Sequence, residues 1–148
     1  MTLTDMGKRQ GLTIIELVIV ISILAIIIGI TTIASNPVQQ FANARNTQRW
    51  SHVNSLINAI SQNIADNNNV FTCTSGAIPT STKVIGTIGG GYNIGPCITP
   101  TYIVTLPFDP KTGTTTDIGY SILQSATSGV ITIYSDDAEL GIAISAAR

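Results

Sequence analysis

The chain has 148 residues, of which 44% are hydrophobic and only 10% are charged, and its formal net charge at pH 7 is -1. This length allows one domain plus one apolar segment. The charge balance argues against nucleic-acid binding through a strongly basic surface, since that mode of binding needs clustered Lys and Arg. The apolar excess lies before residue 35, and the remainder is rich in Thr, Ser, Asn, Ile and Gly.

The N-terminal stretch combines three features in a fixed order. The basic pair Lys8 and Arg9 comes first, Gly11 ends the basic segment, and Glu16 follows five residues later. After Glu16 the apolar run carries no charge. Because basic residues beside an apolar span stay on the cytoplasmic side, we expect residues 1–11 to remain there and the C-terminal part to lie outside.

Three interpretations of the apolar run compete. A signal peptide cut near Ala34-Ser35 would need a shorter apolar core than this one, since such cores span about 7–15 residues. A plain membrane anchor fits the length of Leu17 to Ala34, close to the roughly 20 residues of a span. The third interpretation is a segment that is processed at Gly11 and later packs elsewhere. Glu16 favours the third, because an ionisable group beside a membrane-length helix is costly and a simple anchor gains nothing from it.

The full pattern is a basic pair, Gly11, an apolar residue, Thr13, two isoleucines, Glu16 and a long aliphatic helix. It closely resembles the class III signal of type IV prepilins and of type II secretion pseudopilins, over about the first 35 residues. The resemblance implies that a prepilin peptidase cuts between Gly11 and Leu12 and methylates the new amino group of Leu12. It also implies that Glu16 is the family's glutamate at the fifth mature position.

Elementary chemistry fits these implied roles. Gly11 has no side chain, so extended backbone can approach a peptidase closely. Glu16 of one subunit can neutralise the Leu12 amine of a neighbour, and such a pair in low dielectric favours one axial register. Aliphatic residues of the same helix would then be buried against neighbouring helices. We expect this burial at Leu17, Ile21, Leu24 and Ile28.

A second helical pattern occupies residues 36–69. Pro37 predicts a kink or break at its start, because proline lacks a backbone donor and clashes with the preceding turn. One apolar stripe at helical spacing predicts the face that packs on a sheet. The stripe consists of Val53, Leu56, Ile57, Ile60 and Ile64. Turn-forming residues from Asp66 to Asn69 predict the end of the helix.

The polar residues of this helix receive plain interpretations. We interpret Arg45 and Arg49, four residues apart, as a solvated or subunit-contacting face rather than a ligand site. His52 is the only histidine, and we expect it to be exposed or in a subunit contact. Trp50 is compatible with the membrane interface and with the core of the head domain alike.

Residues 70–148 form the expected head domain. Alternating apolar residues predict strands over 101–106, 118–123, 129–135 and 140–145, arranged as an antiparallel meander. Cys73 and Cys97 lie on the exported side, and such a pair forms a disulfide more often than it supplies reactive thiols. Closing this loop stabilises a fold by roughly 3 kcal/mol. The Gly/Ser/Thr-rich connection between the cysteines predicts a surface loop.

No catalytic or cofactor motif stands out in the head. The run Gly89 to Gly91 lacks the Gly-Lys-Ser/Thr ending of a phosphate-binding loop. Five acids of the C-terminal third are assigned to turns and surface, with a calcium site as the alternative. These acids are Asp109, Asp117, Asp136, Asp137 and Glu139. Their spacing does not reproduce the calcium loop of major pseudopilins, so we expect no metal site. Because the head has no His/Asp/Ser set, we also expect no enzyme activity and no cofactor.

The predicted fold class is α+β, with one long N-terminal helix whose second half packs on a small antiparallel sheet. The expected segments are a removed leader (1–11), a transmembrane and filament-core helix (12–35), an amphipathic helix (36–69) and the head (70–148). The resemblance implies a structural subunit of a type IV pilus-like filament. It also implies a precursor in the cytoplasmic membrane with its head outside, and a mature filament at the cell surface.

The partners implied are further copies of the chain, prepilin peptidase, and the pilus assembly platform with its ATPase, with no nucleic acid expected. Two alternatives stay open: a type II secretion pseudopilin, and a membrane-anchored extracellular binding domain that never polymerises. Adhesion, motility, DNA uptake and secretion all use this scaffold, and residues 70–148 favour none of them.

Overall fold

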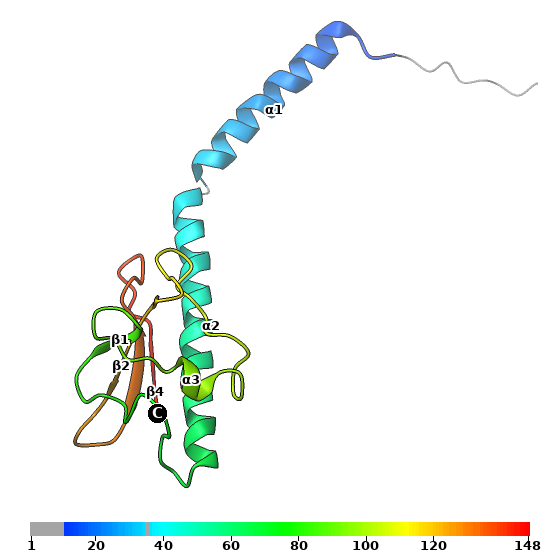
Figure 1. Cartoon of the computed structure of the whole chain (residues 1–148). Helices are drawn as coiled ribbons and strands as arrows, with labels where there is room; N and C mark the ends of the chain where they lie inside the picture. Colours follow the sequence, from blue (N-terminus) through cyan, green and yellow to red (C-terminus); the bar gives the residue numbers. More distant parts are fainter. Residues whose placement is uncertain (1–10, 35) are drawn as a thin grey trace, which may run out of the picture. The chain divides into compact units, whose positions relative to one another are not determined.

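The computed structural model describes residues 11–34 and 36–148, so the basic pair Lys8 and Arg9 lies outside the described residues. The chain divides into two units, one up to residue 40 and one from 41 to 148. The first unit holds helix α1 (Ile14–Ala34) and the beginning of helix α2 (Pro37–Asp66). The second holds the rest of α2 and a small sheet, and Figure 1 shows these elements in chain order.

The expected long helix is two helices, with the break at the predicted proline. α1 ends at Ala34 and α2 begins at Pro37. Proline is well suited to the first helical position, where its missing N–H has no helical partner to lose. Asn36 adopts a left-handed backbone (φ 38°), and its carbonyl accepts hydrogen bonds from the backbone N–H groups of Gln39 (3.0 Å) and Gln40 (3.2 Å). The break predicted at Pro37 is confirmed.

The apolar stripe of α2 forms the core of the head, as predicted. Val53, Leu56 and Ile60 are fully buried, and Ile64 packs at the edge of the core. The helix ends at Asp66, where Asn68 and Asn69 adopt left-handed backbone conformations. The N–H of Asn69 then donates to the carbonyl of Ile64 (2.9 Å) and satisfies one of the open carbonyls at the helix end.

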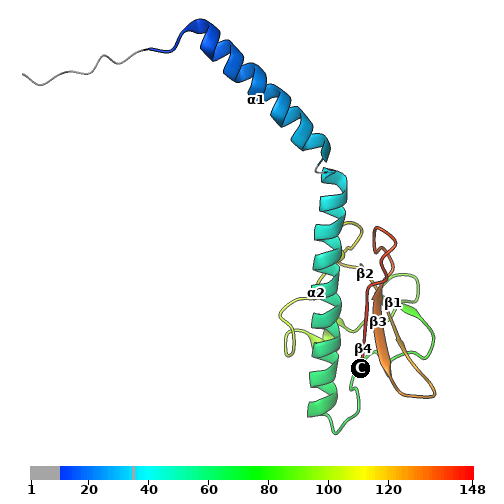
Figure 2. The ribbon, with the colours of Figure 1, turned by 180° about the vertical axis from the view of Figure 1, so that it is seen from behind.

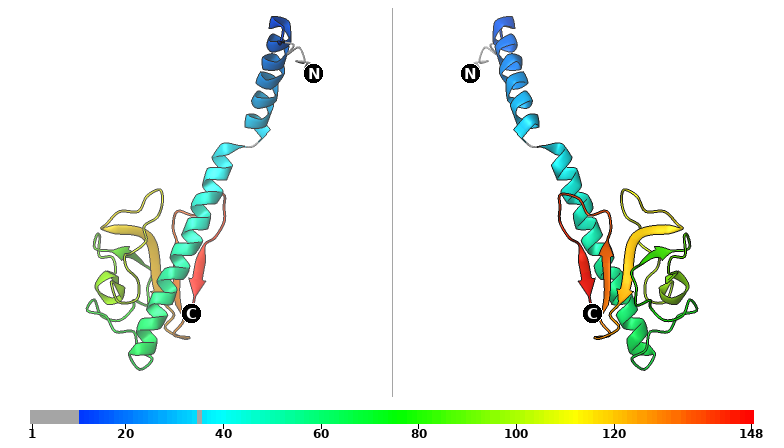
Figure 3. Two further views of the ribbon diagram at one scale, coloured as in Figure 1. Left: turned by 90° about the vertical axis from the view of Figure 1, so that its right-hand side faces the viewer. Right: turned by 90° about the vertical axis from the view of Figure 1, so that its left-hand side faces the viewer.

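The sheet is an antiparallel meander in the order β1-β2-β3-β4, which confirms the predicted topology. Its strands are β1 (Lys83–Gly86), β2 (Asp117–Gln124), β3 (Ile131–Ser135) and β4 (Ser145–Ala147). α2 lies along one side of this sheet, as Figures 2 and 3 show from three directions. Ile122 of β2 stands opposite Ile133 of β3, and both are fully buried in the core.

The strand predicted over 101–106 is wrong. The short helix α3 (Gly95–Ile98) precedes this segment, and the N–H groups of Tyr102 and Ile103 both donate to the carbonyl of Ile98 (2.9 and 3.1 Å). Ile94 and Ile98 are fully buried. Their four-residue spacing anchors a helical turn, and the chain leaves it through further turns instead of an extended strand.

The strand predicted over 140–145 is wrong for most of its length. Leu140 (φ 63°) and Gly141 (φ 67°) lie in the left-handed region, far from the backbone angles of a regular β-strand. Strand β4 begins only at Ser145. Conversely, β1 falls within the segment predicted as a loop. Its last residue, Gly86, packs so closely that an added Cβ would lie 2.2 Å from the carbonyl oxygen of Thr116, so glycine is required there.

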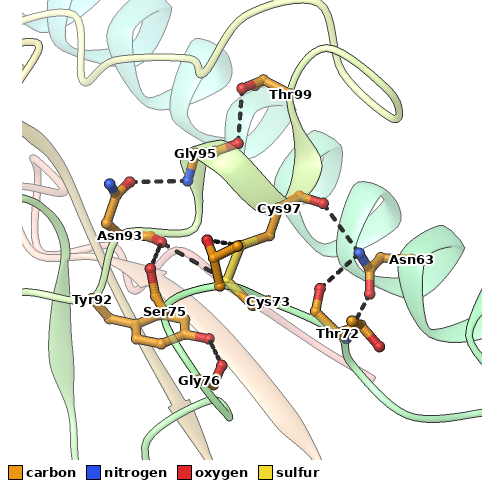
Figure 4. Close-up of a disulfide and its surroundings, with 11 residues drawn as sticks. Asn63, Thr72, Cys73, Ser75, Gly76, Tyr92, Asn93, Gly95, Cys97 and Thr99 are labelled. Atoms are coloured by element: carbon orange, nitrogen blue, oxygen red, sulfur yellow. Dashed lines mark hydrogen bonds between the residues drawn. A yellow bond between two sulfur atoms is a disulfide. The ribbon is translucent and has the colours of Figure 1, made fainter.

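The structure joins Cys73 and Cys97 in a disulfide, with an S–S distance of 1.95 Å and a Cα–Cα distance of 4.9 Å. Asn63 of α2 ties this loop to the helix (Figure 4). Its amide nitrogen donates to the carbonyls of Thr72 and Cys97, both at 3.1 Å, and its amide oxygen accepts from the N–H of Thr72 (2.9 Å). The disulfide loop is therefore fixed to the C-terminal end of α2.

Replacing both cysteines by serine is expected to lower the free energy of unfolding by about 3 kcal/mol, because the loop, with a sequence separation of 24, is no longer closed in the unfolded chain. Urea unfolding of the detergent-solubilised chain measures this loss. The oxidised parent protein with and without reductant is the control. An unchanged unfolding midpoint in both comparisons would contradict the prediction.

Candidate functional site

Helix α1 begins where it does because Thr13 caps it. The hydroxyl of Thr13 accepts a hydrogen bond from the backbone N–H of Glu16 (3.2 Å), and its carbonyl accepts one from Leu17 (3.1 Å). The sequence Thr-x-x-Glu is the signature of a capping box. A carboxylate at the third helical position is also favoured by the positive end of the helix dipole. The sequence analysis did not recognise this cap.

Gly11 and Leu12 precede the cap and are not helical. Both are exposed, so the Gly11–Leu12 peptide bond is accessible in the described part of the chain. A Cβ added at Gly11 would meet no atom within 4 Å, and its backbone is not left-handed. Nothing in residues 11–34 or 36–148 therefore requires glycine here.

Among the side chains of α1 that the structure describes, none is buried against the rest of the chain. Its large apolar side chains up to Ile30, together with Leu12, are between 45% and 83% exposed within the single chain. Leu17, Ile21, Leu24 and Ile28 share this exposure, so the structure does not distinguish them from the other aliphatic residues of α1. The stretch Ile14–Thr31 has a mean hydropathy of 2.9 and is long and apolar enough to cross a membrane.

Two hydroxyl groups of α1 are satisfied within the helix. Ser22 donates to the carbonyl of Val18 (2.7 Å), and Thr31 donates to the carbonyl of Ile28 (3.0 Å). Such bonds reduce the cost of placing a hydroxyl in hydrocarbon. Glu16 is then the single charge of α1, and no ion pair joins it to any cation in the described ranges. The helix therefore suits lipid or the apolar surfaces of other helices.

The head contains a buried ion pair that the sequence interpretation missed. Arg49 and Asp109 have side chains with 0% exposure, joined by two hydrogen bonds, Nε to Oδ2 at 2.6 Å and Nη2 to Oδ1 at 3.1 Å. Arg49 also donates from Nη1 to the Asn46 amide oxygen (2.9 Å) and to Glu139 (3.0 Å). The prediction of a solvated or subunit-contacting Arg49 is wrong, as is a surface role for Asp109.

Glu139 joins the same network from the turn before β4. Arg45 donates to both of its carboxylate oxygens, at 2.6 and 2.8 Å. Asn46 holds its backbone, donating to its carbonyl (2.8 Å) and accepting from its N–H (3.0 Å). Arg49 stands four residues before Val53, in register with the apolar stripe. That register was the sequence signal for its burial.

His52 is half buried instead of exposed. Its Nδ1 lies 2.8 Å from the Tyr120 hydroxyl, and the two rings meet edge to face. Burial lowers the pKa of His52 below its ordinary value and raises the pKa of Tyr120. Within the described ranges no three His, Cys, Asp or Glu side chains come together as a metal site, so the calcium alternative gains no support.

The head is expected to lose stability as pH falls below about 4, the ordinary range of carboxyl pKa values. Burial alone would raise the pKa of Asp109, but hydrogen bonds from Arg49 and from the N–H groups of Lys111 and Thr112 outweigh it and lower the pKa. The hydrogen bonds from Arg45 and Arg49 lower the pKa of Glu139.

The carboxyl groups of Asp109 and Glu139 bind protons at higher pH in the unfolded chain than in the folded chain. Their contribution to stability is therefore present above the pKa of the unfolded chain and is lost as pH falls through the pKa of the folded chain. The lowered pKa of His52 acts in the same direction, beginning below about 6.5. Thermal unfolding of the detergent-solubilised chain at several pH values measures this. A melting temperature that stays constant on acidification would contradict it.

Comparison with known families supports the N-terminal assignment. Residues 6–32 match the family described as the prokaryotic N-terminal methylation motif. No curated protein and no solved structure matches the chain. The match includes Gly11, Glu16 and most of α1.

The methylation motif, together with an apolar helix followed by a second helix and an antiparallel sheet, supports a type IV pilin-like protein. The same findings support a pilin or pseudopilin-like precursor anchored in a membrane. The class III signal implies processing by a prepilin peptidase.

Proposed function

We propose that the chain is a structural subunit of a type IV pilus-like filament. The precursor is cut between Gly11 and Leu12, the new amino group of Leu12 is methylated, and the mature chain polymerises through α1. The observation that supports this proposal best is that the described side chains of α1 expose aliphatic surface on every side of the helix. Helices of other copies can cover that surface once the chain leaves the membrane.

Burial of α1 supplies the driving force for assembly. Outside lipid, each Å² of apolar surface removed from water contributes about 25 cal/mol. Aliphatic packing is not directional, however, and does not choose between neighbouring axial positions. Glu16 adds that choice, because a carboxylate among aliphatic side chains is stabilised only where the Leu12 amine of another copy meets it.

The surface of α2 also supports packing between copies. Between Pro37 and Ala65 none of the exposed side chains carries a charge. Arg49 is buried and Arg45 is half buried in the ion pairs of the head. A helix whose outer face stays exposed to water normally has charged residues on that face. Charge is depleted at the cores of interfaces, because burying it is costly.

Two alternatives share part of this support. A type II secretion pseudopilin has the same signal and the same need to bury α1. It differs from a pilin in the fibre that it forms and not in the N-terminal signal or α1. A membrane-anchored binding domain that never polymerises accounts for the apolar span but for neither Glu16 nor the uncharged face of α2. Further copies of the chain, the assembly platform and its ATPase are the partners that the proposal requires.

The mature N-terminus tests the proposal directly. Mass spectrometry of the chain from its native membrane is expected to find N-methylated Leu12 as the first residue. Gly11→Val is expected to leave the leader attached, because a branched side chain hinders close approach of the peptidase. Gly29→Val is the matched control, since a Cβ at Gly29 also meets no atom. An intact Met1 or a cut near Ala34 in the parent chain would contradict processing.

Polymerisation needs a second observation. Electron microscopy with antibodies against the head is expected to label fibres outside the cytoplasmic membrane. Long surface fibres support a pilus, and fibres that form only when the chain is overproduced together with a secretion system support a pseudopilus. Processed chains that remain single in the membrane would favour the anchored binding domain.

A further inference from the structure

Leu140 combines two unusual properties. Its backbone is left-handed (φ 63°), and its side chain is 48% exposed. That backbone conformation is strained for a bulky residue, and such strain persists only where the surroundings impose it. Glycine would adopt the same backbone without cost. The left-handed turn therefore accounts for the backbone of residue 140 but not for a leucine side chain there.

The surroundings impose this turn on Leu140. Glu139, the residue before it, is held through its side chain by Arg45 and Arg49 and through its backbone by Asn46. Gly141 after it is also left-handed. In all the views the turn before β4 lies beside the N-terminal half of α2. The backbone of the turn is held in place before a partner arrives, so little backbone entropy remains to be lost when a partner covers Leu140.

Other exposed apolar residues accompany Leu140. Phe41 (66% exposed) precedes Arg45 by one helical turn, and Ile142 (43% exposed) follows in the same loop. We call Phe41, Leu140 and Ile142 the apolar knob. Each of the three lies within four residues of Arg45 or Glu139, whose ion pair joins α2 to this turn. Exposed apolar side chains near one another on a surface commonly mark an interaction site.

An apolar groove lies toward the other end of α2. Two adjoining cavities of about 240 and 310 Å³ share Ile64, Asn69, Ile131 and Arg148 as lining residues. The remaining lining includes aliphatic side chains of α2 and of the segment after it, among them Ile57, Ile60, Val70 and Ile78. Each volume is at or below the low end for metabolite sites. Apolar side chains of a protein suit this groove better.

The knob and the groove of one chain cannot meet. On α2, Phe41 lies 16 residues before Ile57 and 23 before Ile64, both of which line the groove, a separation of about 24–35 Å at roughly 1.5 Å per residue. A knob and a groove at opposite ends of one body instead join successive copies head to tail. A contact between different surfaces of identical chains generates a ring if its rotation closes and an open helical fibre if it does not, and the proposed filament requires the second case.

The two surfaces offer one pairing of opposite charges, although Arg45 and Lys111 also lie at the turn, bound to Glu139. Asp136 and Asp137 are exposed in the same turn as Leu140. At the groove, the guanidinium of Arg148 donates a hydrogen bond of 3.4 Å to Asn58 and makes no ion pair with any described residue. Asp66 at the end of α2 interacts with Tyr102 instead. Arg148 is therefore available to a carboxylate of the incoming turn.

We infer that the apolar knob of one copy docks into the apolar groove of a second copy, with Leu140 at the centre of the contact. The contact joins the heads of successive subunits, in addition to the packing of α1. The inference rests on the proposed filament function and adds to it a second, separately testable interface.

Photo-crosslinking in assembled fibres tests the contact. A benzophenone amino acid placed at position 140 is expected to crosslink to residues 57–71 of another copy, identified by mass spectrometry of the crosslinked peptides. The same probe at position 81, an exposed residue outside knob and groove, is the control and is expected to give no crosslink in that range. Crosslinks from position 140 to other regions only, or equal crosslinking from position 81, would overturn the inference.

Leu140→Gly separates assembly from folding. It relieves the backbone strain, so the melting temperature of the solubilised chain is expected to stay equal or rise, while fibre yield falls at least about tenfold. Equal fibre yield would overturn the docking of Leu140, and a lower melting temperature would show that the leucine serves the fold itself. If the unmodified chain forms no fibres, the proposed function fails together with this contact. If fibres form without the crosslink, only the contact fails.

Discussion

Replacing Arg49 by methionine is expected to lower the free energy of unfolding of the head by about 3–5 kcal/mol, the usual cost of removing one partner of a buried ion pair. Methionine keeps the apolar part of the side chain but leaves Asp109 buried without its cation. The N–H groups of Lys111 and Thr112 still donate to Asp109, which holds the loss toward the lower end of this range. Urea unfolding of the solubilised chain measures it.

Arg45→Met is the matched control. Arg45 lies one helical turn away and also binds Glu139, but its side chain is 30% exposed. Exposed pairs contribute little to stability, so the control is expected to lose much less than Arg49→Met. Adding Asp109→Asn to Arg49→Met is expected to recover part of the loss, because the amide removes the buried charge and keeps an acceptor for the two N–H groups. Equal losses for Arg49→Met and Arg45→Met would refute the buried pair as the source of stability.

Local patterns predicted the parts of the chain whose structure depends on neighbours in sequence. The break at Pro37, the apolar stripe of α2 and its end near Asp66 all follow from spacing within one or two turns. Strand β3 alternates between buried and less buried residues along its length and β2 does so over its first four residues, so both were predicted. The motif around Gly11 and Glu16 could be recognised from the sequence because the N-terminal methylation motif is defined by the order and spacing of residues along the chain.

The failures arise where distant residues decide the outcome. Leu140 to Ser145 has strand-like composition, but the turn is fixed by Asn46 and Arg45, which are 93 and 94 residues away from Glu139. Arg49 and Asp109 are 60 residues apart, so the sequence around either residue does not predict that the two form a buried ion pair. The segment 101–106 contains β-branched residues, yet the buried Ile94 and Ile98 before it anchor a helical turn. Long-range contacts overrode local propensity in each case.

The second large effect is expected at Glu16. Glu16→Ala is expected to leave cleavage after Gly11 and methylation of Leu12 intact, but to reduce fibre yield at least about tenfold. A loss of about 1.4 kcal/mol per added subunit suffices for that reduction. The carboxylate makes no ion pair with a described residue of its own chain, so its removal should not unfold the head. The readouts are the mass of the mature N-terminus, the melting temperature of the head and the amount of sheared fibre.

Glu16→Gln is the matched control for charge, because glutamine retains the length, the helix position and the hydrogen-bonding capacity of the side chain. If the amine of Leu12 on another copy is the partner, glutamine should fail almost as fully as alanine. If Glu16 acts only through the first turn of α1, glutamine should assemble normally, since it also serves at the third position of a capping box. A normal yield of sheared fibre from the Glu16→Ala variant would refute both interpretations.

Co-expression of the Glu16→Gln variant with the unmodified chain sharpens this comparison. A variant subunit still offers its own Leu12 amine to a neighbour but no longer supplies the carboxylate that a neighbour's amine requires. It can therefore form one of the two ion pairs that a subunit inside the fibre would make, and mixed fibres are expected to include it below its share of the pool. Inclusion in proportion to its share would mean that the charge of Glu16 does not select subunits, and packing of α1 alone would then have to set their axial register.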